Sequence, residues 1–416
     1  MTRDERCRLA LSFGCVLFAN GDSTENTVSE GERFARALGI GASLLPRWGE
    51  LTLRTEPGAM ASAYQAEANP AGVNMNRVAA ARATLDAMES GALASDEAAT
   101  RVAASASVPQ ASTALFAAAA AAAALALAVL FGVDRPAAAG AIFVSAGAGA
   151  LLRRAVVRYS ANLFVQPFVA ALLAGVIGGA AVHYQISSSL RLVTVCPCMV
   201  LVPGPHVLNS ALDFLDGRIH LGVARMTYAM LVVAAISIGL LLGLGAFGAG
   251  LPVDVGARAI PLWQDVVAAG VCVVAYSIFF STPLSMLPWP VVVGSLAHGL
   301  RWIAMTTFGC GAVGGAFIAC FVVGAALTPV ARRRRTPFAA IGFASVVSMV
   351  PGVLLFRAAS GFVQIADGAG ADLTVIADTL SSGATAVMII VAMGVGLVVP
   401  KLAIDRLMAN PGKVRK

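Results

Sequence analysis

From Ala114 onward the chain is a succession of apolar segments, and this limits its fold more than any other feature. There are ten of them, at residues 114–131, 138–152, 163–182, 192–212, 222–246, 263–280, 286–300, 306–328, 338–356 and 384–402. Inside a bilayer every backbone N–H and C=O must be bonded within the protein, so such segments cross it as helices. Hydrophobic residues make up 58% of the chain and charged residues only 12%, which excludes a soluble protein. The sequence therefore predicts a mainly α-helical integral membrane protein with ten transmembrane helices.

The polar residues gather before the first apolar segment, and every Glu lies at or before Glu97. Here Asp22 or Ser23 can cap a helix that ends near Gly39. Two short extended runs follow at 42–48 and 50–55, and residues 72–91 return to helical spacing. We therefore expect a small α+β domain over residues 1–113. None of the four histidines lies in it, so no nucleophile with a His base can form there, and we expect no enzyme activity.

The apolar part contains an internal repeat. A shift of 148 residues carries Arg153 onto Arg301 and the Val-Pro-Gly at 202–204 onto the Val-Pro-Gly at 350–352. Each copy holds five segments, and an odd number means that the second copy enters the membrane from the opposite side. We expect two inverted five-helix repeats, over residues 114–250 and 251–416. The second and seventh segments are shorter than the ~20 residues of a full crossing.

Basic residues indicate the orientation. Arginines fall in the connections near 153–158, 218–225 and 332–335, and further bases fill the tail after residue 400. Because positive residues favour the cytoplasmic side, both termini and the N-terminal domain are predicted to be cytoplasmic. The net charge of +7 is thus explained by orientation in a lipid bilayer, and no nucleic-acid partner is expected.

Two classes of transporter, metal pumps and nucleotide-driven pumps, find little support in the sequence. Cys196 and Cys198, on either side of Pro197, could offer soft thiolate ligands to a transported metal, but no phosphorylated Asp domain accompanies them. No G-x-x-x-x-G-K-[ST] loop is present to hold a nucleotide. We therefore expect no metal site and no cofactor, and an ion-coupled or facilitated transporter in which broken helices lie at matching places.

The two Val-Pro-Gly sequences are the predicted centre of the site. Pro203 with Gly204, and Pro351 with Gly352, are expected to break the fourth and ninth segments near mid-membrane. The helix that restarts after Gly204 would offer free N–H groups to a substrate carboxylate. Asn209 would line the exit.

Four ionisable residues in or beside the apolar segments are further candidates for the site. Asp213 is either a solvated acid at the end of its segment or a group that carries a proton. His298 lies inside a short apolar segment, where an ionisable group is costly unless it faces a cavity, so it is a candidate for substrate or proton binding. Arg153 and Arg301 either extend to the interface or bind substrate.

Several of these residues also carry a resemblance to a known family. Residues 201–204 (LVPG), followed by Asn209, Asp213, Gly217, Gly222 and Arg225, resemble the threonine/serine exporter family of bacterial membrane proteins. Residues 21–39, residues 72–78 (GVNMNRV), and residues 349–356 (MVPGVLLF) with Arg357 are similar to other parts of that family.

The resemblance implies a secondary transporter of the bacterial inner membrane that exports threonine and serine, driven by the proton-motive force with H+ as the coupling ion. The alternatives are export of a dicarboxylate such as succinate and a non-transport role as a membrane sensor. The expected partners are a small amino-acid or carboxylate substrate and the bilayer, and a homo-oligomer is left open.

The predicted orientation can be tested with reporter fusions. A fusion after Ala106 should be active in the cytoplasm, and one at Asp254 in the periplasm, because an even number of crossings separates the termini and an odd number separates these sites. A periplasmic signal from the first fusion or a cytoplasmic signal from the second would contradict the ten-segment topology.

Overall fold

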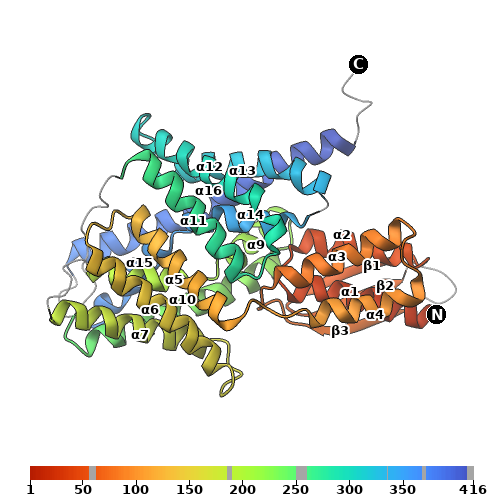
Figure 1. Ribbon diagram of the computed structural model, residues 1–416, viewed down its shortest axis with the longest axis horizontal. Helices are drawn as coiled ribbons and strands as arrows, with labels where there is room; N and C mark the ends of the chain where they lie inside the picture. The colour runs from red at the N-terminus through yellow and green to blue at the C-terminus, as the bar shows by residue number, and fades with distance from the viewer. Residues whose placement is uncertain (56–61, 185–189, 250–259, 335, 368–371, 410–416) are drawn as a thin grey trace.

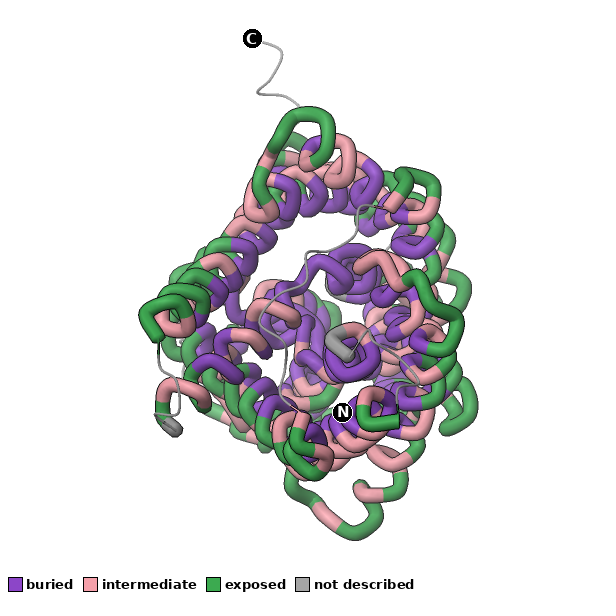
Figure 2. The backbone as a smooth tube through the Cα atoms, turned by 90° about the vertical axis from the view of Figure 1, so that its left-hand side faces the viewer, coloured by how far each residue is buried: buried purple, intermediate pink, exposed green. Residues whose placement is uncertain are grey.

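The protein is mainly helical, and its N-terminal elements form a compact group at one end of a larger set of helices (Figure 1). The computed structural model describes residues 1–55, 62–184, 190–249, 260–334, 336–367 and 372–409. The expected boundary between residues 250 and 251 and the last residues of the basic tail lie outside this range. Buried residues line the inner sides of the helices, and exposed residues face outward (Figure 2).

The N-terminal elements are four helices and a small sheet: α1 Arg3–Ala19, α2 Thr24–Ala37, β1 Ala42–Arg47, β2 Gly49–Thr55, β3 Ala63–Ala68, α3 Met75–Glu89 and α4 Ser95–Ser107. The sheet is antiparallel in the order β1-β2-β3. The α+β prediction and the two strands at 42–48 and 50–55 are confirmed. The third strand and α4 went unpredicted, because their alternating or small residues give a weak hydrophobic pattern.

Local sequence explains where these helices begin and end. Ser23 caps α2 by accepting a hydrogen bond from Asn26 N, and Asn74 caps α3 in the same way. Gly21 follows α1 with φ +93°, a conformation that favours glycine. The core beneath the sheet includes Phe13 and Phe34, whose rings stack at 4.3 Å. The turn between α1 and α2 is thereby held in one position.

The apolar region contains twelve helices and two short 3-10 turns among the described residues: α5 Thr113–Leu130, α6 Pro136–Val156, α7 Val165–His183, α8 Leu190–Met199, α9 Gly204–Leu215, α10 Ile219–Gly245, α11 Leu262–Phe279, η1 Leu284–Met286, α12 Pro288–Thr306, α13 Ala312–Arg334, α14 Phe338–Val346, η2 Val347–Met349, α15 Gly352–Asp367 and α16 Leu373–Ala409.

Seven of these helices are long and apolar enough to cross a membrane, and two bent pairs bring the number of candidate spans to nine. The pairs are α8 with α9 and α14 with α15, which correspond to the fourth and ninth predicted segments. The one remaining predicted segment, the seventh, is α12, a helix of 19 residues that contains His298 and Arg301 and falls below the apolarity of the others. The second segment is longer than expected, since α6 has 21 residues.

The helices α5 to α10 follow the same order as α11 to α16. Six helices of the first set match six of the second at a shift close to 148 residues, and α9 and α15 begin 148 residues apart at Gly204 and Gly352. Packing matches too. The pairs α5 with α6, α7 with α10 and α9 with α16 have counterparts in α11 with α12, α13 with α16 and α15 with α10.

Close packing of α7 on α10 depends on glycine. A Cβ added at Gly243 would lie 2.4 Å from Leu172 O, and one at Gly175 would lie 2.4 Å from Leu240 O. In the second set, a Cβ at Gly324 on α13 would lie 2.6 Å from Leu397 O on α16. Small residues at such contacts let two membrane helices approach backbone to backbone. Both sets of helices therefore depend on the same kind of contact.

Gly243→Ala should lower the thermal unfolding midpoint of the purified protein in detergent. The new methyl group would force α7 and α10 apart, and overpacking of this kind costs about 1–3 kcal/mol. Gly245→Ala is the matched control, because Gly245 is in the same helix and a Cβ there meets nothing within 4 Å. Equal midpoints for the two variants would contradict the close approach.

Candidate functional site

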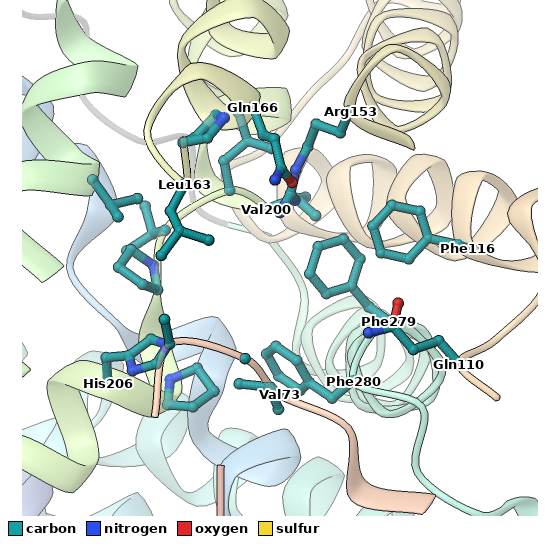
Figure 3. A pocket seen from close by; sticks show the side chains of 18 of the residues that line it. Val73, Gln110, Phe116, Arg153, Leu163, Gln166, Val200, His206, Phe279 and Phe280 are labelled. Atoms are coloured by element: carbon teal, nitrogen blue, oxygen red, sulfur yellow. The ribbon is translucent and has the colours of Figure 1, made fainter. Parts of the chain in front are cut away.

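A cavity of about 380 Å³ lies where the N-terminal elements meet the broken helix α8/α9. Its walls come from the segment between α8 and α9, the end of α6, the start of α7, the end of α11 and the loop before α3. Figure 3 shows Arg153 and Gln166 on one side of the cavity and His206 across from them. Elements far apart in the sequence thus build one partly polar chamber.

Arg154 and Arg153 both line this cavity, and Arg153 has the guanidinium with fewer polar partners. Its Nε is buried and has no hydrogen-bond partner, and no ion pair to it occurs in the described part of the chain. Its guanidinium lies 5.8 Å from the ring centre of Phe116 and 5.6 Å from that of Phe279. The neighbouring Arg154 instead donates to Ala111 O at 3.0 Å. Arg153 is therefore a cation that aromatic faces position and that can accept an anionic group.

His206 and Tyr228 form another part of the wall. Their rings meet edge to face with centres 4.9 Å apart, and Tyr228 also contacts Trp48 from the N-terminal elements. His206 is buried, and its Nδ1 has no hydrogen-bond partner among the described residues. A neutral imidazole here can donate or accept a hydrogen bond, while the aromatic rings limit the size of a ligand.

Two prolines explain the break beside the cavity. Pro203 and Pro205 have no N–H, so the carbonyls of Met199 and Leu201 cannot receive the usual helical bond from four residues on. Met199 O accepts instead from Val202 N at 3.2 Å and from Tyr276 Oη at 3.4 Å. The helix axis bends by 57° here, and by 54° at the matching break between α14 and α15. Leu201 lines the cavity and carries a carbonyl that no helical amide can satisfy.

The expected free N–H groups at the start of α9 are not available. Gly204 N donates to Val202 O at 2.8 Å, and the amides of His206 and Val207 both donate to Pro203 O. That part of the sequence-based hypothesis was wrong, because a tight turn at the break satisfies the amides that a straight helix start would leave unpaired. An anion in this cavity would meet the guanidinium of Arg153 rather than the end of a helix.

The two breaks pack against each other. A Cβ at Gly204 would lie 2.9 Å from Val347 Cγ2, and one at Gly352 would lie 3.3 Å from Met199 Cγ. Pro203 lines the cavity, whereas Pro351, Gly352 and Gly204 are not among its lining residues. The first break therefore faces the cavity, and the second supports it from behind.

Asn209 and Asp213 hold the N-terminal elements in place. Asp213 pairs with the fully buried Arg225 across a 3.0 Å gap from Oδ2 to Nε, and Arg225 donates to Thr24 Oγ1 at 3.3 Å. Asn209 donates to Gly21 O at 3.4 Å. Neither Asn209 nor Asp213 lines the cavity. Both connect α9 to the turn between α1 and α2.

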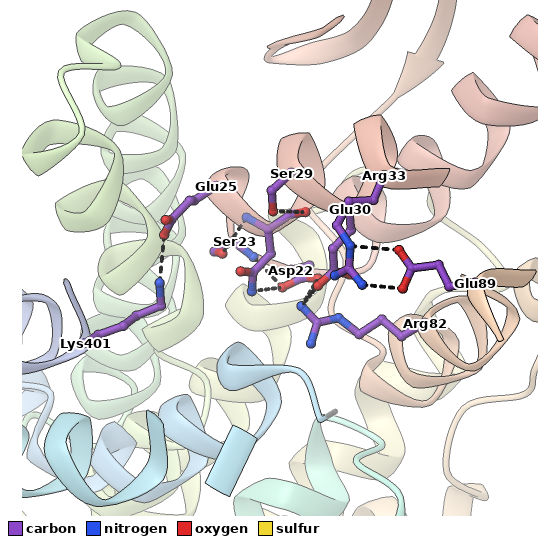
Figure 4. Close-up of polar contacts among 10 residues, drawn as sticks. Asp22, Ser23, Glu25, Ser29, Glu30, Arg33, Arg82, Glu89 and Lys401 are labelled. Carbon is purple, nitrogen blue, oxygen red and sulfur yellow. Dashed lines mark hydrogen bonds and ion pairs between the residues drawn. The ribbon is translucent and has the colours of Figure 1, made fainter. Parts of the chain in front are cut away.

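A second polar junction extends this contact (Figure 4). Lys401 on α16 pairs with Glu25 at 3.0 Å, and Arg82 on α3 pairs with Glu30 and, at 3.7 Å, with Asp22. Burial raises the pKa of Glu30 to about 7, although Arg82 opposes the shift. A raised pKa favours the protonated carboxyl in the folded chain. The protonated Glu30 carboxyl therefore adds to the free energy of unfolding below about pH 4.5, and this contribution is lost as the pH rises through 7.

His298 lies in a different place from the cavity. Its Nδ1 is 2.7 Å from Asp265 Oδ1, and both side chains are buried between α11 and α12. Sequence patterns gave no reason to single out Asp265, nor Gln166 and Tyr228 in the cavity. Arg153 did have a signal, namely its repeat relation to Arg301.

The cysteines beside the break belong to no larger group of metal-ligand residues in the described part of the chain. Cys196 and Cys198 are both fully buried in α8. No group of three or more His, Cys, Asp or Glu that could hold a metal ion occurs among the described residues.

Comparison with known proteins assigns the chain to a family. The family described as "Putative threonine/serine exporter" matches residues 8–246, and the family described as "Threonine/Serine exporter, ThrE" matches residues 265–403. A curated protein of Mycobacterium tuberculosis (strain ATCC 25618 / H37Rv), named "Probable threonine/serine exporter", is 26% identical over 227 residues. The alignment covers 52% of this chain and 41% of the relative's length. No solved structure matches. Two family matches that together span nearly the whole chain, and helices apolar enough to cross a bilayer several times, show that this multi-pass membrane protein belongs to the threonine/serine exporter family.

Proposed function

We propose that this protein exports threonine and serine across the bacterial inner membrane in exchange for protons, and that the cavity at Arg153 is where the substrate enters. The observation that carries the proposal is a guanidinium that has no acidic partner among the described residues, placed beside a broken membrane helix in a chain of this family. Family membership supports amino-acid export. It gives no support to dicarboxylate export or to a sensor.

The walls suit a small zwitterion. The carboxylate would bind the guanidinium of Arg153, and charge-assisted bonds of this kind are among the stronger polar contacts. The ammonium group would meet the Leu201 carbonyl, which the proline at 205 leaves without its helical donor, and the aromatic face of Tyr228. The hydroxyl group shared by threonine and serine would bond to His206 or Gln166. Arg154, the other arginine that lines the cavity, donates to Ala111 O, so Arg153 is the guanidinium left for the substrate carboxylate.

The transport path follows from the proposed topology. Residues 1–113 form a cytoplasmic domain, and 114–250 and 251–416 form inverted five-span repeats with both termini cytoplasmic. Support comes from the matching helix order and packing pairs, and α12 serves as the seventh of the ten crossings despite its two ionisable residues. The cavity then opens toward the cytoplasm. The contact of Gly204 with Val347 and of Gly352 with Met199 closes the way beyond it.

The predicted site residues take distinct parts in this proposal. Pro203 shapes the entry wall, and Gly204 and Gly352 allow the two breaks to meet. Pro351 makes the second break. Asn209 and Asp213 hold the cytoplasmic domain against the cavity, where its loop before α3 forms part of the wall.

Export can be measured in cells that lack the protein and are loaded with threonine, serine or succinate. Re-expression should lower the internal threonine and serine and leave succinate unchanged, and an uncoupler should abolish the difference. A fall in succinate alone would favour the dicarboxylate alternative. No change in any of the three would contradict a transport function.

Arg153→Gln should raise the KM for threonine export by about tenfold or more. Loss of a hydrogen bond to a charged group costs about 1.5–3 kcal/mol, and 1.4 kcal/mol corresponds to a factor of ten. Arg158→Gln is the matched control, since Arg158 follows α6 by two residues and its side chain is exposed. An unchanged KM in Arg153→Gln, at normal membrane abundance, would exclude Arg153 from the substrate site.

A further inference from the structure

Asp265 on α11 and His298 on α12 form a buried ionisable pair that the cavity does not use. The distance from His298 Nδ1 to Asp265 Oδ1 is 2.7 Å, and the residues are only 2% and 5% exposed for His298 and Asp265. His298 Nε2 is buried and has no hydrogen-bond partner in the described part of the chain. An ionisable pair inside membrane helices is costly, so it is retained where it has a function.

Few other charged groups face this pair. Arg301, one turn further along α12, is close enough for the charge of Asp265 to act on it, and Arg301 Nε is also without a hydrogen-bond partner among the described residues. Cys320 on α13 is another titratable group near Arg301. The packed helices α5 and α14 carry no titratable side chain. With a neutral imidazole, Asp265 and Arg301 balance each other, and one added proton gives the cluster a net positive charge.

The pair lies at the opposite end of α11 from the substrate cavity. Asp265 is in the first turn of this helix, and the far end, Phe279, lines the cavity. The separation along the helix is about 21 Å at ~1.5 Å per residue, which is most of a bilayer core. Trp302 donates to Ile260 O at 2.9 Å beside the start of α11, and so covers this end.

The internal repeat allows the residues of this cluster to be compared with their counterparts in the first half of the apolar region. Arg301 is the counterpart of Arg153, so the two inverted halves place one arginine near each side of the membrane. His298 and Asp265 have alanines as their counterparts, Ala150 and Ala117. The surroundings of Arg301 therefore differ from those of Arg153, because only Arg301 has an ionisable pair beside it.

We propose that Asp265 and His298 bind the coupling proton on the outer side of the membrane, with Arg301 balancing the charge of Asp265. This rests on the proposed export function and names the residues that would couple it to protons. A proton from the outer medium bonds to the free Nε2 of His298, and the Asp265 carboxylate stabilises the imidazolium through Nδ1. The same proton leaves to the cytoplasm after the helices repack, while the substrate moves outward. No other bond is made or broken.

The test uses the full chain in vesicles of phosphatidylethanolamine and phosphatidylglycerol. Two quantities are measured: threonine movement driven by a pH gradient, and exchange of labelled for unlabelled threonine at equal pH on both sides. His298→Gln and Asp265→Asn should lose the stimulation by the pH gradient, by about tenfold or more, while exchange continues. Asp265→Glu should recover part of it. His183→Gln is the control, because His183 is exposed at the end of α7.

The outcomes separate the two proposals. Stimulation by the pH gradient that survives in both variants would overturn the proton site, and so would loss of exchange in folded variants, which would make the pair part of the substrate site. Wild-type protein that exchanges threonine without any stimulation by the pH gradient would overturn it as well. Wild-type protein that exchanges neither threonine nor serine would overturn the proposed substrate, and the proton site with it.

Discussion

Two membrane helices are broken at matching prolines, and the contact between the two breaks is the constraint on which the rest of the structure depends. Each break leaves backbone groups without helical partners in a region that offers no bulk water. The first break satisfies its amides within a tight turn, and Tyr276 donates to one of its freed carbonyls. Gly204 and Gly352 then let the two turns touch.

This arrangement leaves room on one side of the first break, and that room is the cavity. Its charge comes from Arg153 and Arg154 at the end of α6, and its aromatic walls come from α5, α10 and α11. The halves share a framework of breaks and glycine contacts but differ in the ionisable residues placed on it. The cavity lies at one end of α11, and a buried His–Asp pair lies at the other. A repeat supplies the geometry, and the chemistry comes from the positions at which its copies differ.

The N-terminal elements form part of the cavity as well as a separate group at one end of the protein. The loop before α3 forms part of the cavity wall, and Met75 N donates to Phe280 O at the end of α11. The buried pair of Asp213 and Arg225 fixes this arrangement, because separating its partners would leave a charge buried and unpaired. A movement of these elements would therefore change the shape of the cavity.

The sequence by itself determined the class of protein, the α+β start, the 148-residue repeat and the position of both helix breaks. These are local properties: apolar length, turn residues and prolines act on the chain wherever it folds. Sequence also indicated His298 and Arg153 as unusual, since an ionisable residue in an apolar segment is visible without a structure.

Only the tertiary structure decided which residues meet. Gln166, Tyr228 and Phe279 come from three helices, and nothing in their spacing shows that they share one cavity. Nothing in the sequence singled out Asp265, and only the packing of α12 on α11 places His298 against it. Asp213 and Asn209 follow the break in sequence, yet they face the turn after α1 instead of the cavity. The physical reason is that side-chain contacts depend on how helices rotate and cross when they pack, and those angles are set by many small contacts at once.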